Sequence, residues 1–418
     1  MTDSVSEPRS RLSINSAYHR LFGASSVSNL SDGVSQLAFP WLASLLTRDP
    51  FLIGAVAAAH RLPWLLLTVP VGILTDRVER ISLMVRADSL RVLASLGIVA
   101  LILALPDTAL GQENAGWAYA LAAFAFLTGT AEVLRDNAAQ TVLPSIVSKP
   151  DLERANGQLW TAETVMGSFI GPPLAGALVA VSTAVPFALN TALYAISALV
   201  LRTVDAPPFV RGTRGSVLEE AVEGWRWLVA HVVILRIAVM LGCMNAMAGM
   251  VMTMLVLLSQ DAYGLDSVGY GLLLTMGAVG GVAGGLTAPR LLRLTGPNGG
   301  VLLALVAFPV CFLILGLANG LTIAGVALAV QMYASMLWNV VTVSYRQRLI
   351  PAELLGRVNS IYRLFAWGMI PVGALLGGAI VGALEQEMAR DAAVRAPYFV
   401  AAAGSTLIWI YGLLRLRL

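Results

Sequence analysis

Lysine is almost absent from this 418-residue chain, because Lys149 is the one lysine and the other 26 of its 27 basic residues are arginine. A P-loop that binds a nucleoside triphosphate needs Gly-Lys-Ser/Thr, whereas Lys149 lies in Val-Ser-Lys-Pro-Asp. ATP hydrolysis through a P-loop is therefore excluded, and we expect no nucleotide as a partner.

Cysteine and histidine are also scarce, with two and three residues respectively. Cys243 and Cys311 both lie inside apolar stretches, so a disulfide framework is not expected. The histidines are isolated from one another and have no metal-ligand spacing. The chain also has no nucleophile elbow, no His-Glu-x-x-His motif and no dinucleotide-binding glycine loop. We therefore expect no metal, no cofactor and no enzymatic activity.

Charged residues make up only 12% of the chain, against about 25% in a soluble domain. Hydrophobic residues make up 57%, and the mean hydropathy is +0.77. A membrane-spanning helix needs about 20 mostly apolar residues, and the sequence predicts twelve such helices in an all-α polytopic membrane protein. The predicted spans are 18–46, 51–74, 81–105, 116–138, 157–181, 184–204, 233–259, 267–289, 299–318, 321–345, 355–383 and 395–415.

Arginines gather in the loops of one side, while the loops of the other side carry mainly Asp and Glu. Arg48, Arg390 and Arg395 are the exceptions. The positive-inside rule predicts that both termini are cytoplasmic, and because the arginines fall at helix ends, the net charge of +3 needs no nucleic-acid partner. The predicted parts are a cytoplasmic tail (1–17), a six-helix bundle (18–204), a cytoplasmic linker with an amphipathic helix (205–231) and a second six-helix bundle (232–418).

The two halves of the chain repeat one another. The stretch from Arg135 to Pro144 recurs from Arg346 to Pro351, and each copy is followed by an asparagine and then a glycine-rich helix. Parallel repeats of this kind are related by an axis along the membrane normal. The repeat predicts two pseudo-symmetric six-helix bundles with a substrate site between them near the midplane.

A short charged loop separates the second and third predicted spans, with Gly72, Asp76, Arg77 and Arg80 as its main residues. It resembles the loop between helices 2 and 3 of the major facilitator superfamily, Gly-x-Leu-Ala-Asp-Arg-x-Gly-Arg-Arg. The positions that depart from this pattern are Thr75, Glu79 and Ile81. The resemblance implies a conformational latch made by this loop, by Arg135, and by Gly356 and Arg357 at the start of helix 11.

Within this superfamily, the series Leu-Pro, Ala-Asn and Gly-Pro-x-Leu-x-Gly is most similar to the macrolide-efflux and enterobactin-exporter branch. The resemblance covers nearly the whole chain. It implies proton-driven export of bulky, mostly hydrophobic solutes across the bacterial inner membrane.

Helix 5 contains Gly167, Gly171, Pro172 and Gly176, whose spacing matches the antiporter motif of the superfamily, Gly-x-x-x-Gly-Pro. A proline removes a helix hydrogen bond and bends the helix, while glycines admit close packing. The functional interpretation is a bend that prevents leak and favours exchange. The alternative is a close-packed helix pair of the kind found in many transporters.

Asp32 lies near the middle of helix 1, where an ionised carboxylate is costly unless it is paired or faces water. Arg61 lies at a similar depth on helix 2, so the pair is either a proton-coupling site or a static ion pair. Glu132 and Glu163 are further candidates for proton exit or contact with a cationic substrate. We assign Asp136, Arg135 and Arg91 to a structural lock around the Asp76 loop.

The second half has no acidic residue in its predicted spans and instead carries a stripe of methionines along helix 7. Flexible, polarizable methionines suit a pocket that accepts many shapes, although such a stripe is also typical of packing. The residues predicted to line a midplane cavity are Gln36, Asn245, Met247, Met250, Tyr333, Tyr362, Arg363 and Trp367.

These features predict a monomeric transporter in the bacterial inner membrane that exports an amphiphilic small molecule in exchange for protons. Its partners would be the small-molecule substrate, protons and membrane lipid. Two alternatives remain open: a lysophospholipid flippase of the same fold, and a sensor or scaffold that does not transport.

Overall fold

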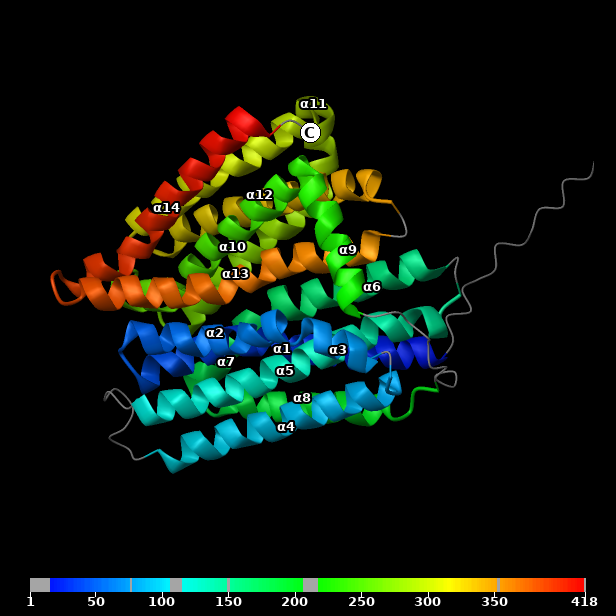
Figure 1. Ribbon diagram of the computed structural model, residues 1–418. Helices are drawn as coiled ribbons and strands as arrows, with labels where there is room; N and C mark the ends of the chain where they lie inside the picture. The colour runs from blue at the N-terminus through cyan, green and yellow to red at the C-terminus, as the bar shows by residue number, and fades with distance from the viewer. Residues whose placement is uncertain are drawn as a thin grey trace, which may run out of the picture.

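A computed structural model describes residues 16–75, 77–105, 115–148, 151–205, 217–351 and 354–416, which form an all-α bundle (Figure 1). Its helices are α1 (Ser16–Leu46), α2 (Pro50–Leu66), α3 (Thr68–Thr75), α4 (Arg80–Ala104), α5 (Ala115–Ile146), α6 (Leu152–Glu163), the π-helix η2 (Thr164–Ile170), α7 (Gly171–Val181), α8 (Val185–Leu201), α9 (Val217–Ala230), α10 (Val232–Leu257), the π-helix η3 (Leu258–Ala262), α11 (Ser267–Leu317), α12 (Leu321–Leu349), α13 (Leu355–Leu384) and α14 (Arg390–Arg415).

Eight helices in the described ranges are long and apolar enough to cross a membrane by length and composition. One of them, α11, contains two spans, because its backbone turns at Gly296 with φ 69° and ψ 171°. Adding α1 and the shorter apolar helices α2 and α8 gives the twelve spans predicted from the sequence.

The twelve spans pack as two bundles of six, the N-half (α1–α8) and the C-half (α10–α14), which lie one above the other in Figure 1. Since each half crosses the bilayer an even number of times, α1 begins and α14 ends on the same side of the molecule. We call this side the terminal face and the opposite side the distal face. The positive-inside pattern predicts that the terminal face is cytoplasmic.

Helix boundaries differ from the predicted ones where proline or polar sequence intervenes. The predicted span 51–74 is divided into α2 and α3 at Leu67 because Pro70 has no N–H to donate to the preceding turn. The predicted span 116–138 continues as α5 to Ile146, since a helix need not end where its apolar stretch ends.

The fifth span, called helix 5, consists of α6, η2 and α7. It carries the antiporter sequence and widens into the π-helix η2 just before Pro172 and Pro173. Neither proline has an N–H, so two backbone hydrogen bonds of an ordinary α-helix are missing here. The N–H of Gly171 accordingly donates to the carbonyl of Met166, five residues back. The structure thus shows a local change of helix type at the place where the sequence predicts a bend.

The linker contains α9, which packs on the terminal end of α13. Leu228 is fully buried there with Val358, and the indole of Trp225 lies parallel to the ring of Phe365. Glu223 accepts from Arg357 in an ion pair. The remainder of the linker, 206–216, is outside the described residues.

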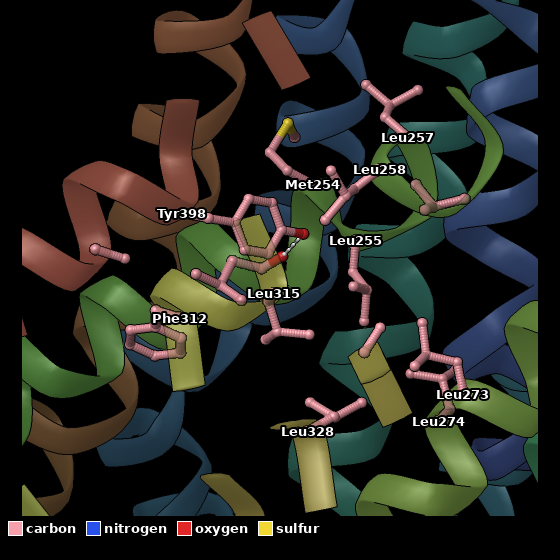
Figure 2. Packing of buried hydrophobic residues seen from close by; sticks show 14 of the residues in the cluster. Met254, Leu255, Leu257, Leu258, Leu273, Leu274, Phe312, Leu315, Leu328 and Tyr398 are labelled. Carbon is pink, nitrogen blue, oxygen red and sulfur yellow. Dashed lines mark hydrogen bonds between the residues drawn. The ribbon is translucent and has the colours of Figure 1, made fainter. Parts of the chain in front are cut away.

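The C-half is held by apolar packing. Tyr398 lies among Met254, Leu255, Phe312 and Leu315 (Figure 2). Its hydroxyl donates to the carbonyl of Val251 at 2.9 Å, so this polar atom is satisfied inside the apolar core. The buried charged side chains among the described residues belong to the N-half.

Candidate functional site

Three charged side chains are enclosed by helices of the N-half. Asp88 and Arg91 of α4 have no exposed surface, and Arg135 of α5 is 2% exposed. The Asp88 carboxylate lies 3.2 Å from Arg135 Nε and 3.7 Å from Arg91 Nη1, and the Ser197 hydroxyl donates to it at 2.6 Å. Buried charges of this kind persist because each has an opposite charge and hydrogen bonds nearby.

Asp32 of α1 lies at the edge of this group. Its Oδ1 accepts a hydrogen bond from the Tyr194 hydroxyl at 2.8 Å and lies 3.4 Å from Arg91 Nη1. The Asp32 side chain is 30% exposed, whereas Arg91 behind it has no exposed surface. Asp32 is therefore the partly exposed member of a group of charges that are otherwise buried. We call Asp32, Asp88, Arg91, Arg135 and Tyr194 the charge cluster.

Serines on one face of α1 surround the charge cluster. Ser28 accepts from Arg91 at 3.0 Å, Ser25 accepts from Arg135 at 3.4 Å, and Ser35 accepts from Asn190 at 2.8 Å. These serines recur at helical spacing, so they form a polar stripe on α1 that faces inward. This stripe and Tyr194 were missed in the sequence analysis; the serine spacing was the available signal.

The antiporter residues lie beside Asp32. A Cβ at Gly33 would stand 2.3 Å from the carbonyl oxygen of Gly167, and a Cβ at Gly171 would stand 2.5 Å from the backbone of Gly33. Only glycine permits α1 and helix 5 to approach this closely. The close packing of the motif and the position of the carboxylate are thus parts of one arrangement.

The predicted pairing of Asp32 with Arg61 is wrong. Arg61 Nη1 lies 3.4 Å from Glu132 Oε1, and His60 Nε2 lies 3.7 Å from the other oxygen of that carboxylate. Arg61 extends from α2 toward Glu132 of α5, and Arg91 of α4 is the arginine that lies beside Asp32. Glu132 is therefore the partner of Arg61.

The remaining acidic candidates are more open. Glu163 ends α6 and is exposed. Asp136 is 35% exposed and lies 3.9 Å from Arg135. The N-half therefore combines exposed or partly exposed acidic side chains with two buried arginines, Arg91 and Arg135.

The structure places the latch residues in different surroundings. Gly72 belongs to α3, Arg77 is exposed in the turn that follows, and Arg80 begins α4. Asp76 lies outside the described residues. Arg135 lies in the charge cluster, and Gly356 is in the first turn of α13. Arg357, beside it, pairs with Glu223 of α9.

Gly176 lies farther along helix 5, at the contact between the two halves. The Ser267 hydroxyl donates to its carbonyl at 2.8 Å, and a Cβ at Gly176 would stand 2.4 Å from the carbonyl oxygen of Ser267. The antiporter sequence thus runs from the charge cluster to the surface between the halves.

The methionine stripe is mainly packing. Met250 is 1% exposed and lies 3.1 Å from where a Cβ of Gly377 would be, so its predicted place in a cavity lining is wrong. Met247 is partly buried and approaches Gly404 of α14. Asn245, on the same helix, donates to the carbonyl of Ala366 at 2.6 Å.

The other predicted lining residues divide into enclosed and open ones. The Tyr333 hydroxyl lies 2.9 Å from that of Thr287, and Tyr362 is buried beneath the Arg346 guanidinium. Trp367 is 43% exposed and stacks on Trp64 across the two halves, with ring centroids 5.3 Å apart. The open residues are Gln36 and Trp367; the side chain of Arg363, on α13, is outside what the structure describes.

Comparisons with known proteins agree with this architecture. An enterobactin exporter, EntS, of Shigella boydii serotype 4 (strain Sb227) is 25% identical over 393 residues, which cover 93% of this chain and 90% of the exporter. The same exporter of Escherichia coli O1:K1 / APEC is 24% identical over the same coverage.

Solved structures show the same fold. The nucleoside transporter NupG superposes with a TM-score of 0.75 at 13% identity, covering 96% of this chain and 99% of that one. A bacterial homologue of the iron transporter ferroportin in an inward-facing state gives a TM-score of 0.73 at 18% identity, with coverage of 95% and 98%.

The family model described as transmembrane secretion effector matches residues 11–408. The relatives named above are exporters, and the solved structures that share the fold are transporters. The chain therefore belongs to the transmembrane secretion effector family, within the major facilitator superfamily.

Proposed function

We propose that this transporter exports an amphiphilic small molecule from the bacterial cytoplasm in exchange for protons, and that Asp32 is the group that carries the proton. The observation that supports this most directly is the position of Asp32, which is partly open while its partners Arg91 and Tyr194 are buried. Similarity to enterobactin exporters supports export and favours a siderophore-like or drug-like solute.

When ionised, Asp32 attracts Arg91 and accepts the Tyr194 hydroxyl proton in a hydrogen bond. A proton on the Asp32 carboxylate removes the charge that attracts Arg91. Arg91 still has Asp88 at 3.7 Å and the Ser28 hydroxyl at 3.0 Å, so it keeps partners on its own side. Protonation would thus weaken the attraction between α1 and α4 without leaving a buried charge unpaired.

A change in the position of α1 would reach the rest of the N-half through its contact with helix 5. Gly33 follows Asp32 directly and packs against Gly167 and Gly171. Since this contact is between backbones, α1 cannot shift without helix 5 responding. Proton binding at Asp32 is thereby coupled to the helix whose far end, at Gly176, meets the C-half.

The proton gradient supplies enough free energy for this exchange. One pH unit is worth roughly 1.4 kcal/mol per proton, and a membrane potential of about 100 mV adds roughly 2.3 kcal/mol per charge. Together they support a several-hundred-fold outward gradient of a neutral solute at one proton per cycle.

The test is transport into everted membrane vesicles, with a panel of fluorescent dyes and a catechol siderophore as probes, with and without a protonophore. Asp32→Asn should abolish uphill accumulation while binding or passive exchange stays measurable. Asp391→Asn is the matched control, because Asp391 is an exposed carboxylate paired within α14.

Uphill transport by Asp32→Asn at the wild-type level would overturn the role of Asp32 and move coupling to Glu132 or Glu163. Flipping of lysophospholipid in proteoliposomes without dependence on a pH gradient would instead favour the flippase. No movement of any probe by a folded wild-type protein would favour the sensor or scaffold.

A further inference from the structure

Two of the three arginines that depart from the positive-inside pattern lie together at the distal face. Arg48 lies between α1 and α2 of the N-half, and Arg390 begins α14 of the C-half. Asp261, in the π-helix η3 that continues α10 at its distal end, lies between them. These residues are brought together from three separate parts of the chain.

Asp261 binds one arginine with each carboxylate oxygen. Arg48 Nη2 lies 2.6 Å from Oδ1, and Arg390 Nε lies 2.8 Å from Oδ2. Both Nη atoms of Arg390 also donate to the carbonyl of Arg48 at 3.2 Å, while Glu385 accepts from Arg390 at 2.7 Å. The Asp261 side chain is 13% exposed, so these bonds are partly shielded from water.

A second polar contact adjoins the first. The side-chain amide of Gln260 donates to the Ser44 hydroxyl at 2.9 Å. Both contacts join the N-half to the C-half.

Arg395, the third exceptional arginine, provides the contrast. It pairs with Asp391 one turn earlier on α14 and donates to the carbonyls of Gly316 and Ala318 and to the Asn319 side chain. All of these partners belong to the C-half, so Arg395 stabilises one half and does not join the two.

The apolar contacts beneath these bonds are made by small residues. A Cβ at Gly378 would stand 2.4 Å from the carbonyl oxygen of Pro50, and a Cβ at Gly54 would stand 2.7 Å from that of Ala374. At these positions the two halves meet backbone to backbone, with no side chain inserted between them. The polar bonds above them, together with the hydrogen bond from Ser267 to the carbonyl of Gly176, are therefore the specific interactions that must break when the distal face opens.

We propose that Arg48, Asp261 and Arg390 form a distal gate that holds the two halves closed at this face, with Asp261 as the carboxylate shared by both. Release of substrate to the distal side requires Asp261 and Arg390 to part from Arg48, while the bond between Asp261 and Arg390 stays within the C-half. The proposal rests on the chain being a transporter that alternates between faces, and it does not depend on proton coupling or on Asp32.

The test measures how often the distal face opens. Ser267→Cys, at the buried contact with Gly176, is placed in a Cys243→Ala/Cys311→Ala background. A membrane-impermeant maleimide is then added to the outside of intact cells. Asp261→Asn and, separately, Arg48→Gln should each raise the rate of labelling roughly tenfold, which corresponds to about 1.4 kcal/mol in the closed–open equilibrium.

Asp391→Asn is the matched control and should leave the labelling rate unchanged, since it breaks an Asp–Arg pair within the C-half at the same face. The double variant Arg48→Gln/Asp261→Asn should label no faster than either single variant, because all three lack the same bond. Gel filtration checks that each variant is folded.

Labelling of folded Asp261→Asn and Arg48→Gln at the rate of Asp391→Asn would overturn the gate. Additive increases in the double variant would also overturn it, since independent effects mean that the two residues do not act through one bond. Labelling needs neither substrate nor a proton gradient, so loss of proton-coupled export would not change this result.

Discussion

At the scale of single residues, Asp88 and Asp136 carry the same charge in different surroundings. Asp88 has no exposed surface and contacts Arg91, Arg135 and Ser197. Asp136 is 35% exposed and lies 3.9 Å from Arg135. The two carboxylates should therefore contribute differently to stability.

Asp88→Asn should destabilise the protein by about 3–5 kcal/mol, because Arg91 and Arg135 remain buried with one negative charge fewer. Asp136→Asn should cost only about 0–1 kcal/mol, since that ion pair is long and partly hydrated. Thermal melting of the purified variants in one detergent checks this ordering. Equal melting temperatures would contradict the view that the charge cluster is a buried network.

Met250 and Trp367 should differ in how they affect substrate choice. Met250→Ala opens a cavity between α10 and α13 at a cost of about 2–5 kcal/mol, so export of every probe should fall in proportion to protein abundance. Trp367→Ala removes an open aromatic surface and should change the ratio of aromatic to aliphatic probes exported. A selective effect of Met250→Ala at normal abundance would contradict this assignment.

At the scale of helices, helix 5 combines a π-helical segment with a backbone contact to α1. The missing N–H groups of Pro172 and Pro173 account for the wider turn in η2. Gly167 and Gly171 account for the close approach to Gly33. One short sequence thus determines both the local helix type and the distance to the helix that carries Asp32.

Gly171→Ala should be poorly tolerated, because its Cβ would stand 2.5 Å from the backbone of Gly33 and cannot be relieved by a rotamer change. We expect a loss of about 1–3 kcal/mol and a matching loss of export. Gly157→Ala is the control on the same helix, since nothing lies within 4 Å of its Cβ position. It should be neutral or stabilise by up to about 1 kcal/mol. A wild-type melting temperature for Gly171→Ala would show that the helices can move apart without cost.

At the scale of the whole molecule, the two halves differ in where their charged side chains lie. The N-half holds the buried charges, the buried side chains described in the C-half are uncharged, and the polar bonds of the distal face join the two. Glu385 belongs to that face, just beyond the end of α13. Burial raises the pKa of its carboxyl, although the nearby Arg390 guanidinium lowers it.

A raised pKa means that the folded protein holds this proton to a higher pH than the unfolded chain does. As pH rises from about 4.3, the ordinary pKa of glutamate, through the raised value, Glu385 therefore costs the folded state free energy. Glu385→Gln lacks this cost, so its melting temperature relative to the wild type should increase between pH 4.5 and pH 7. A relative melting temperature that falls over this range would mean that the bond to Arg390 outweighs burial.

The sequence alone predicted the all-α fold, the twelve spans, the repeat of two six-helix bundles and the superfamily, and all of these are confirmed. They were predictable because the bilayer imposes a length and an apolar composition on every span.

Only the tertiary structure decided which charges meet. The sequence predicts similar depths for Asp32 and Arg61, yet the rotation of each helix about its axis and its neighbours pair Asp32 with Arg91, and Arg61 with Glu132. Arg48 and Arg390 were visible in the sequence only as exceptions, and their common partner Asp261 is far from both along the chain. The place of a residue along its helix follows from the local sequence. The direction in which its side chain points and the residue that it contacts depend on how side chains of different helices pack, which no single segment encodes.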